Sequence, residues 1–376
     1  MSKIERLELI KQIQIERGSF VICYFVGDRP GSQFTISRDA IRKIYDHLKH
    51  IPKNSKIDLI LYSSGGDASV PWGLVSIIRE FANEFSVLVP FHAFSAATMI
   101  ALGADSIIMC ENGTLSPIDP AVNSDFNPVH EQTKQPLRIN VEDVTSYISL
   151  LKEESKVGLK DQQALANVLK SLTEKVNPLA LGYVNRHHSF IRLVAKKLLN
   201  SHRDKLDSDV IDKIVQELIE KIYFHGHSIS RKEAKDIGLK IELPNENLEN
   251  ILWKLYLEYE SEMKLNSPVV PEDILEDVND DNFIEDKSIA VYLESIYKTD
   301  KFVGKLKISR VRRLPGNVNL SLNLQLPSGI DQRQLNPRVS EEINRTIQEA
   351  IREQLKQQAE VIGYQIKFVK FHWEVE

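Results

Sequence analysis

Cysteine is scarce in this chain, which has only Cys23 and Cys110 among its 376 residues. Each of the two lies within a run of apolar residues, so we expect two buried free thiols in a reducing compartment. So small a count gives no support to a disulfide framework or to a cysteine-based metal site.

Long apolar runs are also missing. The N-terminal stretch, residues 1–19, is charged throughout and has no apolar segment typical of a secretory signal. The longest candidate, residues 93–110, is interrupted by polar residues and falls short of the roughly 20 apolar residues that span a bilayer. These absences predict a cytoplasmic protein that does not contact a membrane.

An excess of basic residues is absent as well, because the formal net charge is −5. The chain as a whole therefore does not favour nucleic acid as a partner. One basic cluster, within residues 305–313, mostly alternates along a single expected strand, which is typical of a solvated sheet face. The histidines at 187–188 and 225–227 lack carboxylate or cysteine partners at a recognised spacing, so no metal site is predicted.

What is present is ordinary globular composition, with 42% hydrophobic and 27% charged residues. Length and composition favour one large domain with a smaller one. Apolar, β-branched stretches predict strands at 19–26, 57–62, 86–91 and 106–109, and helical spacing predicts helices between them, at 37–50, from 68 to about 81, and at 94–102. This alternation predicts an α/β fold with a largely parallel sheet.

The second half of the chain has a different pattern. Residues 141–222 are nearly all helical in spacing, with a break at Asn177-Pro178, and residues 266–288 combine two prolines with many acids. We interpret 266–288 as an acidic linker, with an acidic helix face as the alternative. Residues 289–376 predict a small α+β domain: a hairpin formed by 303–314 and 317–326, a helix at 338–361 and a strand at 363–375. The expected domains are therefore 1–265 and 289–376.

Two segments carry the chemistry. The first is Ser64-Gly65-Gly66-Asp67, which follows the second expected strand and precedes a helix. Paired glycines let the backbone turn sharply and approach a ligand, and free N–H groups at such a junction can bind negative charge. A tight turn with nothing bound is the alternative.

The second segment is Phe94-Ser95-Ala96-Ala97, which follows the third expected strand and opens a helix of small residues. The field at a helix N-terminus would stabilise an alkoxide or an oxyanion near Ser95. A helix-capping serine is the alternative. Both segments are expected at the carboxyl ends of neighbouring strands, where open α/β sheets place their sites.

Taken in this order, the motifs resemble the Clp-protease/crotonase superfamily. Within it they resemble the peptidase branch of Clp protease and signal peptide peptidase A, and most of all the serine dehydrogenase proteinase family. The resemblance covers about residues 15–245 and is carried by residues 61–67, 92–97, 100–104, 113–120, 225–226 and 230–239. It implies a Clp-protease/crotonase-like fold, to which the pattern of residues 289–376 adds a C-terminal α+β domain. It also implies no cofactor, a protein or peptide substrate and a homo-oligomer.

The resemblance also implies the roles of particular residues. Ser95 would attack an acyl carbonyl, and the backbone N–H groups of Gly66 and Ala96 would form the oxyanion hole. Gly65 and Asp67 would line the bound substrate. The product would be an acyl-enzyme that water then hydrolyses.

The general base is less well defined by the sequence. The Clp-protease pattern expects a histidine about 25 residues after the serine, where this chain has Ser116-Pro117-Ile118-Asp119-Pro120. The signal peptide peptidase branch uses a lysine that opens a helix and is followed by an asparagine, and Lys175 fits this pattern if residues 141–172 are an insertion. A solvated helix residue is the alternative for Lys175. His130, Lys134 and Lys152 are the other candidates.

Two other functions stay open. A crotonase-type enzyme would use the same oxyanion hole for an acyl-CoA thioester without a serine nucleophile, which Ser95 argues against. A catalytically inactive scaffold would keep the sheet and the hole without a working base. The sequence favours a serine peptidase with a Ser-Lys dyad over both.

Overall fold

The computed structural model describes residues 3–118, 121–122, 126–129, 139–152, 157–221, 226–313, 345–351, 354–355 and 359–376. The chain divides into two compact units. The first comprises Met1–Pro268, Ile289–Val303 and His372–Glu376, and the second comprises Val269–Ser288 and Gly304–Phe371.

The centre of the first unit is a mostly parallel sheet. Its strands β1 (Phe20–Val26), β4 (Ser55–Tyr62), β5 (Ala82–Val89), β7 (Ser106–Met109) and β12 (Ile241–Glu242) are all parallel and lie in the order β12-β7-β5-β4-β1. Beyond β1 the order continues with β13 (Asn282–Ser295), β14 (Lys298–Arg313) and β15 (Glu360–Val375). β13 pairs antiparallel with β1, from Cys23 opposite Glu294 to Val26 opposite Val291.

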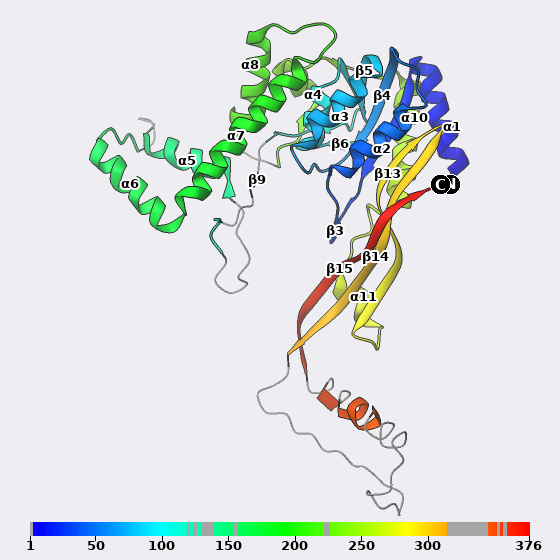
Figure 1. Ribbon diagram of the computed structural model, residues 1–376, viewed down its shortest axis with the longest axis vertical. Helices are drawn as coiled ribbons and strands as arrows, with labels where there is room; N and C mark the ends of the chain where they lie inside the picture. The colour runs from blue at the N-terminus through cyan, green and yellow to red at the C-terminus, as the bar shows by residue number, and fades with distance from the viewer. Residues whose placement is uncertain are drawn as a thin grey trace, which may run out of the picture. The chain divides into compact units, whose positions relative to one another are not determined.

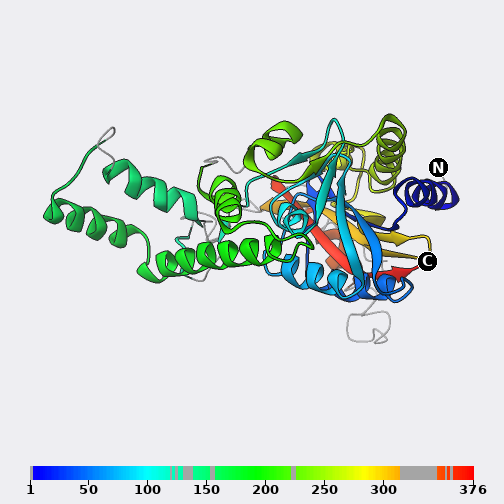
Figure 2. The ribbon, with the colours of Figure 1, turned by 90° about the horizontal axis from the view of Figure 1, so that it is seen from above.

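Helices cover both faces of this sheet (Figures 1 and 2). On one face, α1 (Lys3–Arg17) packs against α10 (Glu246–Glu262). On the other lie α2 (Asp39–Leu48), α3 (Val70–Arg79) and α4 (Ala96–Leu102), with α7 (Pro178–Leu199) packed on α3 and α4. The strand residues are buried on both faces because helices flank each of them, which explains the continuous apolar runs in the sequence.

The remaining helices follow the central α/β layers along the chain. They are α5 (Val141–Lys152), α6 (Gln162–Lys175), α8 (Ser208–Gln216), the π-helical turn Glu217–Lys221 and α9 (Arg231–Ile237). The α6 helix buries none of its residues. In Figure 1, α5 and α6 lie at the end of α7 that is distant from α4. No helix in the described part of the chain is long and apolar enough to cross a membrane.

Small strands complete the first unit around the expected site. The three-stranded sheet β11-β8-β6 contains β6 (His92–Ala93), parallel to β8 (Thr114–Leu115), and β11 (Ile229–Ser230), antiparallel to β8. A hairpin of β2 (Asp28–Arg29) and β3 (Ser32–Gln33) follows β1, and β9 (Ala121–Val122) pairs with β10 (Ile139–Asn140). The β6 strand leads directly to Ser95.

The large core lies between the sheet and the α1–α10 layer. It includes Ile10 and Ile13 from α1, alternate residues of the strands, and one face of α10. Cys23 and Cys110 belong to this core, and both are free and buried. Burial raises the pKa of both thiols far above their ordinary value.

The second unit has its own small core. Val269, Leu275, Leu306 and Ile308 are buried together between α11 (Pro271–Glu276) and the strands. Most of the basic cluster is bonded to the acidic segment here: Lys305 pairs with Asp286, and Arg310 donates to the carbonyl oxygens of Val278 and Asp280 at 2.9 Å each. The basic cluster therefore serves to hold the acidic segment.

The structure divides the chain differently from the expected boundaries at 265 and 289. The stretch 266–288, expected as a linker, contains α11 and the start of β13, and two of its acids, Asp281 and Asp286, pair with Arg312 and Lys305. Ile289–Val303 belongs to the first unit because β13 pairs with β1. Residues 345–351 are helical and β15 covers the expected last strand, whereas the second strand of the expected hairpin, 317–326, falls outside the described residues.

Candidate active site

Ser95 stands at the junction between β6 and α4 in an unusual backbone conformation. Its φ of 52° and ψ of −112° lie where a residue with a side chain is strained, and such strain clusters at functional sites. Ser95 occupies the N-cap position of α4, but its side chain makes no capping hydrogen bond. The hydroxyl is therefore not used to cap the helix.

A buried serine holds the backbone of Ser95. The N–H of Ser95 donates to Oγ of Ser116 at 2.7 Å, and that hydroxyl donates in turn to the carbonyl oxygen of Pro117 at 2.9 Å. Ser116 is 3% exposed, and its own N–H donates to Oγ1 of Thr98 on α4. The N–H of Ser95 is thus occupied by Ser116.

The Gly65-Gly66 turn lies beside Ser95, as expected from the ends of β4 and β5. A Cβ built on Gly65 would lie 2.7 Å from Cβ of Ser95 and 3.2 Å from its Oγ. Gly65 has a φ of +110°, a conformation that favours glycine. Only glycine permits so close an approach between this turn and Ser95.

Gly66 is held by the backbone of Ile36. Ile36 donates to the carbonyl oxygen of Gly65 at 2.8 Å and accepts from the N–H of Asp67 at 2.9 Å, so Gly66 is bracketed on that side. A Cβ on Gly66 would lie only 2.4 Å from the nitrogen and oxygen of Ile36. In such a bridge the N–H of Gly66 itself faces away from Ile36.

Two backbone N–H groups are available at this site. Within the described part of the chain, neither the N–H of Gly66 nor that of Ala96 donates a hydrogen bond to any protein atom. Ala96 is the first residue of α4, where the helix geometry leaves an N–H without a partner. A negatively charged oxygen is the natural acceptor for such donors.

Asp67 has a different environment. Its Oδ1 accepts from the N–H of Ser69 at 2.8 Å just before α3, and its Oδ2 lies 3.7 Å from Nε of Arg38. The carboxylate therefore closes a turn and pairs with an exposed arginine.

A polar cluster that no sequence motif marks lies beneath the Gly65-Gly66 turn. Asp28 accepts from Tyr62 at 2.6 Å through Oδ1, and its Oδ2 accepts from Ser64 and lies 2.9 Å from Nε2 of His92. Asp28 precedes Ser64 by 36 residues and His92 by 64. No local pattern marks Asp28, so only the tertiary structure reveals it.

Lys175 is not brought to Ser95 of the same chain. It is the exposed last residue of α6, three residues before α7 begins. The opposite end of α7 packs near Gly103, where a built Cβ would lie 3.0 Å from Cδ2 of Leu198. The 22 residues of α7 extend about 33 Å, so Lys175 and the residues of α7 that pack beside Gly103 lie at opposite ends of this helix.

The other candidate bases do not complete the site. Lys152 is the last residue of α5, and α5 contacts α7. In Figure 1, α5 lies at the end of α7 that is distant from α4. His130 and Lys134 lie outside the described residues. His187 and His227 have local partners, the carbonyl of Tyr183 at 3.2 Å and Oε1 of Glu233 at 2.8 Å. The described ranges contain no group of three or more His, Cys, Asp or Glu residues that could hold a metal ion.

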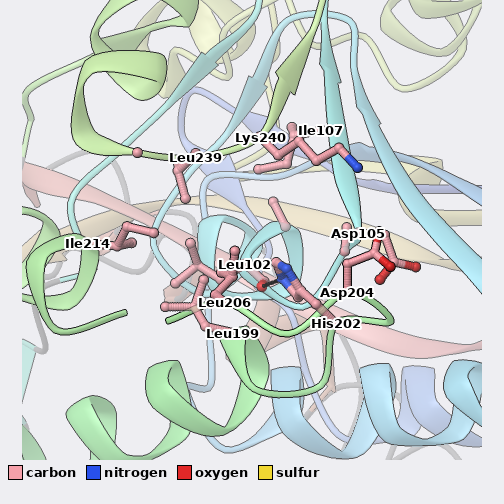
Figure 3. A pocket seen from close by; sticks show the side chains of 13 residues that line it. Leu102, Asp105, Ile107, Leu199, His202, Asp204, Leu206, Ile214, Leu239 and Lys240 are labelled. Atoms are coloured by element: carbon pink, nitrogen blue, oxygen red, sulfur yellow. Dashed lines mark hydrogen bonds between the residues drawn. The ribbon is translucent and has the colours of Figure 1, made fainter. Parts of the chain in front are cut away.

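A cavity of about 70 Å³ lies at the opposite end of α4 from Ser95 (Figure 3). Leu102, Leu199 and Leu239 line its apolar side, and Asp105, His202 and Asp204 lie at its polar side. His202 is tied to the carbonyl oxygen of Leu102 at 2.7 Å, and burial lowers its pKa. The length of α4 separates this cavity from Ser95, so it is not the place of the reaction.

Comparison with known proteins agrees with this geometry. Residues 2–180 match the family described as ClpP-like SDH-type serine proteinase. Two uncharacterized proteins of Methanocaldococcus jannaschii, MJ0137 and MJ1495, are 24% and 22% identical to the chain. The alignments cover 64% and 63% of this chain and 74% and 72% of those proteins. Over residues 2–180 the chain is thus similar to the ClpP-like SDH-type serine proteinases, and its α/β sheet and the strained Ser95 beside paired glycines agree with that similarity.

Proposed function

We propose that this protein is a serine peptidase that cleaves peptide bonds through an acyl-enzyme on Ser95. The observation that carries the proposal is the strained, uncapped Ser95 lying against Gly65, with the N–H groups of Gly66 and Ala96 unused nearby. The family match supports a serine proteinase at the coarser level. We include in the proposal the cytoplasmic location and the homo-oligomer that the sequence predicts.

The chemistry follows from these groups. Oγ of Ser95 bonds to the carbonyl carbon of the substrate while its proton passes to a base, and the carbonyl oxygen becomes an oxyanion. The N–H groups of Gly66 and Ala96 then donate to this oxyanion, each contributing on the order of 3–4 kcal/mol. Collapse of the intermediate breaks the C–N bond as the amine takes the proton, and water hydrolyses the acyl-serine.

Lys175 is the base in this proposal, and its position requires it to act on a neighbouring copy. Lys175 lies next to the N-terminal end of α7, whereas the C-terminal end of that helix packs beside Gly103 at the end of α4. A lysine accepts a proton only as the neutral amine, which burial favours. An interface between copies would supply both the short distance and the burial that an exposed helix end lacks.

The nucleophile is tested by labelling with a fluorophosphonate probe, followed by mass analysis of the modified peptide. We expect the probe on Ser95 in the wild type, no labelling of Ser95→Ala, and normal labelling of Ser208→Ala, which changes the exposed first residue of α8. Absence of labelling in the wild type would overturn the proposal and favour an inactive scaffold or a thioester-binding protein.

The base is tested by mixing two inactive variants, Ser95→Ala and Lys175→Ala, under conditions that exchange subunits. If the dyad forms between copies, random mixing in equal amounts restores about a quarter of the wild-type activity. Lys170→Ala, which changes another exposed lysine of α6, serves as the control and should stay active. Full activity of Lys175→Ala by itself would remove Lys175 from the mechanism.

A further inference from the structure

The cluster around Asp28 lies directly beneath the proposed oxyanion hole and plays no part in the mechanism so far. The side chain of Asp28 is 15% exposed and that of His92 is 11% exposed. Burying a carboxylate is unfavourable unless donors satisfy it. Three donors do so here, and they come from the end of β4, from the turn that follows it and from β6.

The protonation states of the cluster follow from its contacts. Burial by itself would raise the pKa of Asp28, but hydrogen bonds from His92, Ser64 and Tyr62 outweigh burial and lower the pKa to about 2. The carboxylate is therefore charged at neutral pH and only accepts hydrogen bonds. Nε2 of His92 must then carry the proton that it donates to Asp28.

In the described part of the chain, the ring of His92 makes no hydrogen bond to Ser95, so its contacts do not place it as the base. Its Nε2 is directed at Asp28 at 2.9 Å, with Ser64 at 3.4 Å on the same side. The ring lies between Tyr62 and Phe94, with centroid distances of 4.3 and 4.6 Å. His92 is thus held rigidly three residues before Ser95 and acts as an anchor.

The cluster connects the parts that define the position of Gly66. Asp28 belongs to the β2–β3 hairpin, and the same loop continues to Ile36, which brackets Gly66 by two backbone bonds. Ser64 immediately precedes Gly65, and His92 precedes Ser95. One carboxylate therefore joins the loop that holds Gly66 to the segment that presents the nucleophile.

We propose that Asp28 is a positioning residue, which sets the distance between the N–H of Gly66 and Ser95 through its bonds to Ser64 and His92. This inference rests on the proposed function and deepens it. A change at Asp28 should weaken binding of the tetrahedral intermediate more than binding of the substrate, because only the intermediate depends on the exact place of the oxyanion donors.

The test compares Asp28→Asn with Asp58→Asn. Asp58 is the matched control: it is buried in the middle of β4, before the turn, and is bonded to Arg17 and Ser19 at 2.8 Å each. We expect Asp28→Asn to acylate roughly 10- to 100-fold more slowly and to lose affinity for a peptide boronic acid in parallel. Affinity for an uncleaved peptide, measured in the Ser95→Ala background, should change less than twofold.

Two further variants keep the proposal testable if Asp28→Asn does not fold. His92→Gln retains a donor toward Asp28 and should keep more of the acylation rate than His92→Phe. Amide hydrogen exchange of the peptide containing residues 63–67 should speed up in the Asp28 and His92 variants and stay unchanged in Asp58→Asn. That readout does not depend on catalysis, so it separates failure of this inference from failure of the peptidase proposal.

The inference is overturned if Asp28→Asn acylates at the wild-type rate. It is equally overturned if Asp28→Asn and Asp58→Asn lose the same rate and show the same exchange. Two results together would overturn the peptidase proposal and leave the positioning role supported. The wild-type protein would not label at Ser95, and amide exchange in Asp28→Asn would be faster than in the wild type.

Discussion

At the scale of single residues, the site depends on backbone geometry that ordinary side chains resist. Ser95 has a positive φ, and a buried hydroxyl from Ser116 occupies its N–H at 2.7 Å. A strained residue persists only where its surroundings hold it in place. Because this bond already uses the N–H of Ser95, the proposed oxyanion donors are the N–H groups of Ala96 and Gly66.

Replacing Ser116 by alanine should therefore slow acylation roughly tenfold, since the buried N–H of Ser95 would lose its acceptor, at a cost of about 1–3 kcal/mol. Fluorophosphonate labelling rates measure the effect. Ser106→Ala, which removes a buried hydroxyl bonded to Ser86 away from the site, is the control. An equal loss of rate in both variants would argue against a specific role for Ser116.

Gly65 offers a second prediction at this scale. Alanine there would place a Cβ 2.7 Å from Cβ of Ser95 on a backbone with a φ of +110°, so the nucleophile must shift. A displacement near 1 Å lowers rates on the order of 100-fold, and we expect at least that loss of labelling in Gly65→Ala.

The control for Gly65 is another glycine. Gly182 lies within α7, and a Cβ built on it meets no atom within 4 Å. Gly182→Ala should label normally and gain about 0.5–1 kcal/mol in its free energy of unfolding, because alanine favours the helix. Normal labelling of Gly65→Ala would contradict the close packing between the turn and Ser95.

At the scale of elements, α7 buries one stripe of its surface and exposes the rest. Its C-terminal half buries Ile191, Val194, Leu198 and Leu199, and packs on α3 and α4. On the same half, Leu193 is 52% exposed, and Leu179 near the N-terminus is 59% exposed. One stripe of α7 therefore packs against α4, the helix that begins directly after Ser95.

Truncating that stripe should destabilise the protein. Leu198→Ala should lower the free energy of unfolding by about 2–5 kcal/mol, since Leu198 is fully buried against Gly103. Leu193→Ala should change it by less than about 0.5 kcal/mol. Urea unfolding measures both, and similar losses would mean that α7 does not pack as described.

At the scale of the whole molecule, strands far apart in the chain complete one sheet. β13 pairs with β1 although more than 250 residues separate them. The pairing also brings Glu294 to Arg6, at 2.9 Å, with both side chains almost completely buried. Residues near the end of the sequence are therefore part of the unit that contains Ser95.

A chain ending at Pro268 should therefore fail to fold as a stable monomer. It would leave β1 as an open edge and Arg6 as a buried charge without Glu294, which costs about 3–5 kcal/mol. A chain ending at Val303 keeps β13 and should retain the far-ultraviolet circular dichroism of the first unit. Size-exclusion chromatography distinguishes the two, and a monodisperse, folded chain ending at Pro268 would contradict this account.

The sequence by itself determined the features that depend on neighbouring residues. Apolar runs located β1, β4, β5 and β7, and the glycine pair and the serine before small residues identified the two turns at Gly65 and Ser95. These signals are local because strand burial and positive φ act on a few consecutive residues. The order of the motifs was enough to indicate the family.

Only the tertiary structure decided how distant residues meet. It placed Asp28 beneath the turn, joined Ser116 to Ser95, recruited β13 to the sheet and left Lys175 at an exposed helix end. Hydrogen bonds and strand pairs of this kind depend on the folded path of the whole chain, and no spacing within the sequence encodes them. The base is therefore the part of the proposed site that the sequence could define least.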